Sequence, residues 1–163
     1  MIGIAILVIV SILYIKNDSS SGVKVTTEAK KVVEPKEFVK ENGKYCFHRL
    51  QLATAKEPYR VEEKVVLNIK DGGVVGSKNG TQNGPDMTNG YTGDLAGFIK
   101  GEDLELTYSY IVEGSKGKEL EVYKFQNDTL VKMHWLLSDK DGVLTPDRVG
   151  APKMIFFQEI KCE

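Results

Sequence analysis

Leu104-Glu-Leu-Thr-Tyr-Ser-Tyr-Ile-Val112 is the stretch that decides the fold class, because its side chains alternate in character at every second position. Its apolar face carries Leu104, Leu106, Tyr108, Tyr110 and Val112. The opposite face carries Glu105, Thr107 and Ser109. A period of two residues is typical of a half-buried β-strand. This stretch therefore predicts a strand with one face toward a core.

The same alternation recurs on both sides of that strand. In residues 60–70, one face carries Val61, Val65, Leu67 and Ile69. Further strands are predicted at 120–125, 131–137 and 155–162, with weaker ones at 45–54, 73–77 and 91–99. Helical periodicity is absent from these segments, so we predict an all-β domain of about eight strands.

Short polar segments with turn chemistry separate the predicted strands. They are Asp71–Gly73, Lys100–Asp103, Glu113–Gly117, Asn127-Asp128 and Asp139–Gly142. Connections this short can join only antiparallel neighbours. We therefore expect an antiparallel up-and-down meander that curls into a lipocalin-like barrel or half-barrel. Curling is favoured by Gly90, Gly93, Gly97 and Gly101, where the missing side chains permit bends.

The two cysteines lie in the first and last predicted strands, at Cys46 and Cys162. If the sheet closes, these strands become neighbours and the two residues come within disulfide distance. A disulfide would indicate an oxidising compartment. The alternative is two separate free thiols. Two sulfurs without paired histidines make a metal site unexpected.

The first fifteen residues, 1–15, are apolar and uncharged. As a helix they would cover roughly 22 Å, which is short for a membrane span unless flanking residues snorkel. No basic segment precedes the run and no small-residue cleavage site follows it. We therefore expect an uncleaved membrane anchor, with the folded domain outside the cytoplasm, in the periplasm or at the cell surface. A cleaved or truncated signal peptide and a buried core helix are the alternatives.

Residues 16–42 form a polar linker in this interpretation, with a short helix near 35–41, and residues 43–163 form the barrel-like domain. The net charge of −1 provides no basic surface, so we expect no nucleic-acid partner. No sequence motif calls for a cofactor. The expected partners are the membrane, through residues 1–15, and a small molecule or another envelope protein.

A polar stretch at 78–90 is the expected loop, and loops on a barrel rim often bind ligands. A small apolar or envelope-derived molecule would be held where this loop meets the nearest aromatic side chains. The candidate contacts are Asn83, Asp86, Tyr91, Tyr108 and Trp135. A loop without function, with the aromatic residues in the core, is the alternative.

Catalysis finds little support, because the chain has no nucleophile motif of the strand–turn–helix type. The alternative function is a hydrolase of envelope material that uses Glu113 and Glu121 with His134. Solvated charges on turns and strands explain the same residues. A third interpretation is a structural protein that pairs with another chain through a free sheet edge.

Residues 93–125 combine Gly93, Gly97 and Gly101 with Glu102-Asp103-Leu104, Tyr108, Tyr110 and Glu113-Gly114, followed by Glu121-Val122 and Phe125. This pattern resembles a group of small bacterial envelope proteins of the Bacteroidetes and their neighbours, many of them lipid-anchored. The resemblance implies an extracytoplasmic β-domain and no particular activity. Unlike the lipid-anchored members, this chain has no cysteine after its apolar run.

Overall fold

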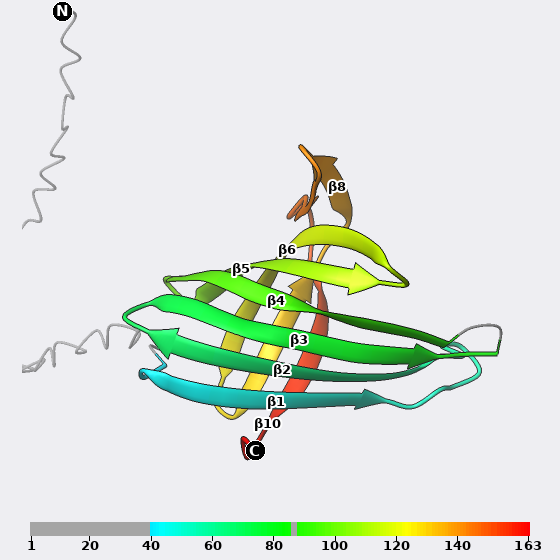
Figure 1. Cartoon of the computed structure of the whole chain (residues 1–163), viewed down its shortest axis with the longest axis horizontal. Coiled ribbons are helices and arrows are strands. Elements are labelled where there is room, and N and C mark those ends of the chain that lie inside the picture. The colour runs from blue at the N-terminus through cyan, green and yellow to red at the C-terminus, as the bar shows by residue number, and fades with distance from the viewer. Residues whose placement is uncertain (1–39, 86–87) are drawn as a thin grey trace, which may run out of the picture. The chain divides into compact units, whose positions relative to one another are not determined.

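The computed structural model describes residues 40–85 and 88–163 and contains strands but no helix in these ranges (Figure 1). The strands are β1 (Gly43–Gln51), β2 (Arg60–Lys70), β3 (Gly73–Asn83), β4 (Thr88–Lys100), β5 (Asp103–Val112), β6 (Ser115–Gln126), β7 (Thr129–His134), β8 (Leu137–Lys140), β9 (Val143–Pro146) and β10 (Lys153–Ile160). The all-β prediction is confirmed.

The N-terminal predictions fall largely outside the described residues. The apolar run 1–15 lies there, as does the linker up to residue 39. Of the helix expected near 35–41, residues 40 and 41 are described, and neither is helical. Within the described ranges, no helix has the length and apolarity that a membrane crossing requires.

Eight of the strands close into a barrel. Following the hydrogen bonds gives the order β5-β4-β3-β2-β1-β10-β7-β6, and β6 pairs with β5 to complete the circle. Every pair in this circle is antiparallel. Figure 1 shows β7 and β10 crossing the direction of β1–β4 at a steep angle. The predicted meander is therefore confirmed in its closed form.

The hairpin β8–β9 interrupts the meander between β7 and β10. It joins the sheet through β9, which pairs in parallel with β6 at Glu119 and Leu144. β8 is the free edge of the sheet. The turn predicted at Asp139–Gly142 lies at the tip of this hairpin, where Asp141 and Gly142 have positive φ. The barrel is therefore an eight-stranded meander with one added hairpin.

The core lies inside the barrel and consists of inward-facing residues of the eight barrel strands, whereas on β7 four consecutive residues, 130–133, are buried. Phe47, Leu67, Leu106, Tyr123 and Phe157 are fully buried there. On β5, the apolar face predicted from 104 to 112 points inward, since Leu104, Leu106 and Tyr108 are all buried. Burial of such side chains contributes about 1.5–3 kcal/mol each, which makes this interior the main source of stability.

Glycines on the inner face permit the close approach of neighbouring strands. A Cβ at Gly93 or Gly97 would overlap the backbone oxygens of Ser109 and Glu105 on β5. These two glycines therefore allow close approach of β4 and β5, while the predicted bends at them stay a prediction. Gly101 has a φ of 61° in the β4–β5 turn, whereas a Cβ at Gly90 would meet no atom closer than 3.9 Å.

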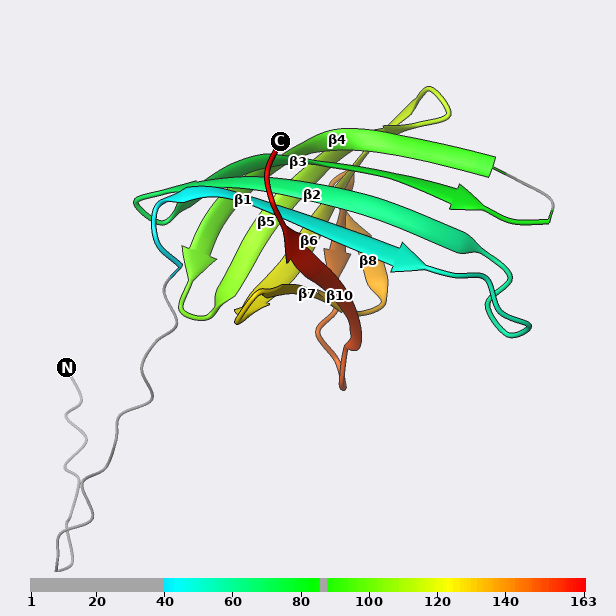
Figure 2. The ribbon, with the colours of Figure 1, turned by 90° about the horizontal axis from the view of Figure 1, so that it is seen from below.

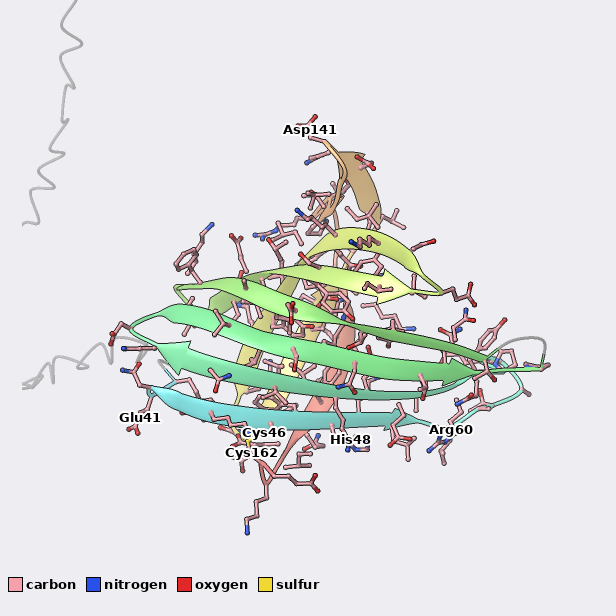
Figure 3. All side chains as sticks on the ribbon, viewed as in Figure 1. Glu41, Cys46, His48, Arg60, Asp141 and Cys162 are labelled. Carbon is pink, nitrogen blue, oxygen red and sulfur yellow. A yellow bond between two sulfur atoms is a disulfide. The ribbon has the colours of Figure 1, made fainter. Side chains whose placement is uncertain are left out.

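The seam between β1 and β10 is short, because only three residue pairs join them, from Cys46–Ile160 to His48–Gln158. A disulfide between Cys46 and Cys162 lies at one end of this seam, with the two Cα atoms 5.3 Å apart (Figure 3). The predicted disulfide thus links the first strand to the segment after the last one. It encloses almost the whole barrel in one covalent loop.

The chain enters the barrel at one end, which we call the linker end. There the side-chain amide of Asn42 donates a hydrogen bond to Asp71 Oδ1 (3.1 Å). In return, the backbone N–H of Asp71 donates to Asn42 Oδ1 (2.9 Å). The register places the β2–β3, β4–β5 and β6–β7 turns at this same end (Figure 2). The opposite end, which we call the far end, holds the β3–β4 and β5–β6 connections and the start of β10.

Several predicted bounds differ from the observed strands, and two differences change the interpretation. The expected loop at 78–90 is mostly strand, because β3 continues to Asn83 and β4 begins at Thr88. The strand expected at 131–137 ends at His134, and the chain then turns into the separate strand β8. In both cases strand pairing, and not the local apolar pattern, sets the boundary.

Candidate functional site

The outer wall of the barrel carries a polar row across four neighbouring strands. Ser77 of β3 pairs with Asp94 of β4, Asp94 with Ser109 of β5, and Ser109 with Lys118 of β6. These four residues, the polar row, face outward because they alternate with buried inward residues such as Lys78 and Tyr108. The row brings two hydroxyls, a carboxylate and an ammonium group onto one line.

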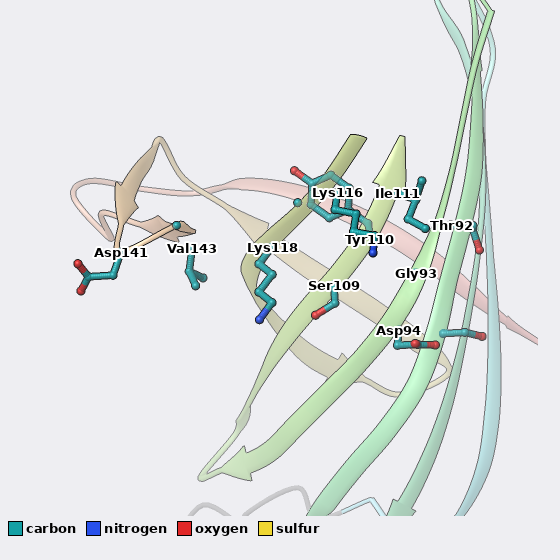
Figure 4. A pocket seen from close by; sticks show the side chains of 13 residues that line it. Thr92, Gly93, Asp94, Ser109, Tyr110, Ile111, Lys116, Lys118, Asp141 and Val143 are labelled. Atoms are coloured by element: carbon teal, nitrogen blue, oxygen red, sulfur yellow. The ribbon is translucent and has the colours of Figure 1, made fainter. Parts of the chain in front are cut away.

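A cleft of about 690 Å³ lies above the polar row, and we call it the outer cleft (Figure 4). A second row, Thr92, Ile111 and Lys116, completes its floor. Asp141, Gly142 and Val143 at the tip of the β8–β9 hairpin form the opposite wall. The volume lies within the range of about 300–1,000 Å³ that is typical of small-molecule sites.

Four charged side chains in the outer cleft make no ion pair with any described residue. They are Asp94, Lys116, Lys118 and Asp141. Many other charged residues of the barrel are paired, as Lys124 is with Glu102 and Asp103. The unpaired donors and acceptors of the cleft are thus available to a ligand.

The barrel interior, by contrast, contains a self-contained buried ion cluster. Glu121, which is 1 % exposed, accepts hydrogen bonds from the ammonium groups of Lys78 and Lys132 and from the hydroxyl of Tyr123. Lys132 also donates to Glu119 (2.9 Å), and the Lys78 ammonium lies 4.0 Å from the centroid of the Tyr108 ring. Each charge in this cluster therefore has a protein partner.

The electrostatics of the cluster follow from burial and from these pairs. Burial lowers the pKa of Lys78, although Glu121 opposes the change. Burial alone would raise the pKa of Glu121, but the two lysines outweigh it and the net pKa lies below the ordinary value. Burial also opposes the charge of Lys132, yet Glu121 and Glu119 raise its pKa. Glu121 is therefore held as a carboxylate.

A second ionic group fills the interior toward the far end. Arg49 donates to Glu63 and Gln51, and the Tyr91 hydroxyl donates to Glu63 (2.7 Å). Burial, followed by the charge of Glu63, raises the pKa of Tyr91 well above its ordinary value. Tyr91 also covers Gly80, since a Cβ at that glycine would overlap the ring. These contacts fill part of the barrel interior with protein side chains.

The predicted ligand contacts that the structure describes lie in several places. Tyr91 and Tyr108 are inside the barrel, where Tyr108 donates to the Lys78 carbonyl (3.1 Å). Trp135 follows β7, and its indole donates to the Gly150 carbonyl (3.1 Å). Asn83 ends β3, and Asp86 lies outside the described residues.

The residues of the hydrolase alternative are also separated by the fold. Glu113 is exposed in the β5–β6 turn, whereas Glu121 lies eight residues further along the chain, inside the barrel. His134 ends β7 opposite Lys153, and no described hydrogen bond joins it to either glutamate. In the described ranges, no three His, Cys, Asp or Glu side chains are grouped closely enough to hold a metal ion.

Comparison with known proteins returned no matching family model, curated protein or solved structure. The resemblance to bacterial envelope proteins therefore stays a prediction.

Sequence reasoning missed the outer cleft altogether. Its residues come from five strands and a hairpin turn, and no local pattern marks them. For the second ionic group a signal was present, since Glu63 occupies a core position of the alternating strand 60–70.

Proposed function

We propose that this chain is a non-catalytic, membrane-anchored envelope protein whose barrel lies outside the cytoplasm and binds a small polar ligand in the outer cleft. The apolar run at 1–15 supports the anchor. The Cys46–Cys162 disulfide supports an oxidising compartment, because such bonds persist mainly outside the cytoplasm. The remaining question is what the barrel binds.

The observation that carries the binding proposal is the line of unpaired polar groups in the outer cleft. Asp94 accepts hydrogen bonds, and Ser77 and Ser109 on either side both donate and accept. A ligand with neighbouring hydroxyl groups matches this pattern. Lys116 and Lys118 are two residues apart on the same face of β6, roughly 7 Å along the strand, and they suit an anionic group.

These groups together fit an acidic saccharide, that is, a sugar that carries a carboxylate or a phosphate. Ile111 and Val143 provide apolar contact for the carbon face of a sugar ring. The interior offers no comparable opportunity, because both ionic groups there are satisfied by protein partners.

The test uses the full-length chain in detergent, with binding of glucuronate and glucose measured by titration. Glucuronate should bind more tightly than glucose. The double variant Lys116→Gln/Lys118→Gln should weaken glucuronate binding at least tenfold, which corresponds to about 1.4 kcal/mol. Lys64→Gln is the matched control, because Lys64 is exposed on the outer face of β2 and does not line the cleft.

Equal affinity in the double variant and the wild type, or no binding of either sugar by the wild type, would overturn the ligand assignment. A change of the same size in Lys64→Gln would show that general surface charge, and not the cleft, attracts the ligand.

A further inference from the structure

The outer wall becomes apolar toward the linker end. One row below the polar row, Val75 of β3 pairs with Ala96 of β4, and Thr107 of β5 pairs with Leu120 of β6. In the next row lies Phe98, which is 65 % exposed, while Val75 is 59 % exposed. Together with Lys70, Lys100 and Glu105 these residues line a shallow groove of about 860 Å³, which we call the apolar groove.

Such a surface needs a partner. An exposed phenylalanine beside an exposed valine leaves contiguous apolar area in water, and patches of this kind mark interaction sites. The polar row on the same four strands shows that the wall is not apolar throughout. The wall changes from polar to apolar within two residues along each strand, and the apolar part lies toward the linker end.

The position of the groove relative to the chain entry indicates the partner. Asn42 is hydrogen-bonded to Asp71, and Lys70 and Gly73 of the groove flank the same β2–β3 turn. The apolar run 1–15 is joined to this end through residues 16–39. Even fully extended, 24 residues span at most about 85 Å, so the linker end stays within reach of any membrane that holds the run.

The rim of the groove is also suited to a lipid surface. Lys70 is exposed and makes no ion pair with a described residue. Lys100 pairs with Glu105, and its side chain is 66 % exposed. Lysines beside exposed aromatic and aliphatic side chains are typical of protein surfaces that rest in the headgroup layer.

We infer that the apolar groove rests on the phospholipid surface, with Phe98 and Val75 entering the headgroup layer and Lys70 and Lys100 near the lipid phosphates. This inference rests on the membrane anchor of the proposed function. It also orients the barrel, because the polar row then lies one row, roughly 7 Å along the strands, further from the lipid. The outer cleft would open beside the membrane surface.

The test is nitroxide labelling of the full-length protein in vesicles of phosphatidylcholine and phosphatidylglycerol. Both native cysteines are in the disulfide, so Phe98→Cys and Val75→Cys each supply a single reactive thiol. Leu52→Cys is the control, since Leu52 is 65 % exposed and directly follows β1 at the far end, away from the groove. Collision of the label with oxygen reports lipid, and collision with a polar nickel complex reports water.

The labels at 98 and 75 should collide more with oxygen and less with nickel than the label at 52. If the protein sediments with the vesicles but all three labels are equally accessible to nickel, the groove does not contact lipid and the anchor still stands. If the protein does not sediment with the vesicles, the anchor and the groove assignment fail together.

Other occupants of the groove give different signals, and each would overturn the lipid assignment. A second copy of the chain would shield the labels from both reagents and broaden their spectra through spin–spin contact. The run 1–15 folded onto the groove would shield them from both reagents without broadening.

Discussion

Replacing Glu121 by Gln should destabilise the barrel strongly, because this carboxylate is the shared acceptor of the buried ion cluster. The substitution preserves the size of the side chain and removes its charge. Lys132 keeps Glu119 as a partner at 2.9 Å, but Lys78, which is 4 % exposed, loses the one ion pair it makes with a described residue. The variant therefore leaves one buried ammonium group without an ion-pair partner among the described residues, with only the more distant charge of Glu63 to favour it.

Two arguments set the size of this effect. Breaking a buried ion pair on one side costs about 3–5 kcal/mol. Lys78 can also lose its proton, and from the ordinary lysine pKa of 10.5 this costs about 5 kcal/mol at pH 7, at about 1.4 kcal/mol per pH unit. The second figure is an upper limit, because Lys78 either stays charged or loses its proton, whichever costs less free energy. A loss of about 3–5 kcal/mol would be a large share of the 5–15 kcal/mol that stabilises a typical domain.

Urea unfolding with the disulfide intact measures this loss. Glu62→Gln is the control, because Glu62 pairs with His48 (3.2 Å) and Arg60 (2.7 Å) on the outer face, where water screens the pairs and their contribution to stability is small. In the Glu121→Gln variant the folded state binds fewer protons at Lys78 than the unfolded state does. Its stability should therefore rise between pH 7 and 10 more than that of the wild type. A loss below about 1 kcal/mol without this pH dependence would refute the role given to Glu121.

Three further predictions concern acid, the disulfide and the glycines. The pKa of Glu121 is lowered in the folded state, so the stability of the wild type should fall as the pH falls from about 4.5 through that lower pKa. Urea unfolding at a series of pH values measures this loss, and Glu121→Gln should lack it. Replacing both Cys46 and Cys162 by serine, which removes a link between residues 116 positions apart, should lower the unfolding free energy by about 4–5 kcal/mol, and an unchanged urea midpoint would contradict this. Gly97→Ala should cost about 3 kcal/mol or more because its Cβ overlaps the Glu105 backbone, whereas Gly90→Ala, with open space around it, should cost less than about 1 kcal/mol in the same measurement.

The sequence predicted those features of the fold that depend on one strand at a time. Alternation located the strand at 60–70 with its observed bounds, and turn chemistry located the Asp71-Gly72 and Asp141-Gly142 turns. Closure and the disulfide followed from the order of the strands and the positions of Cys46 and Cys162. These inferences need no knowledge of cross-strand register.

The missed features depend on register or on a neighbouring strand. Residues 78–83 have few apolar side chains, and they are a strand because β2 and β4 pair with them and because the Tyr91 ring covers Gly80. Lys78 and Glu121 are 43 positions apart and meet only when the barrel closes. The outer cleft has the same origin, since its polar row exists only once four strands are aligned.

Amide chemical-shift mapping of the full-length protein with saturating glucuronate tests most directly whether binding occurs on the outer wall and not inside the barrel. The largest changes should fall at Ser77, Asp94, Ser109 and Lys118. Changes centred on interior residues such as Val65 and Leu106, or no change at any amide, would contradict the account.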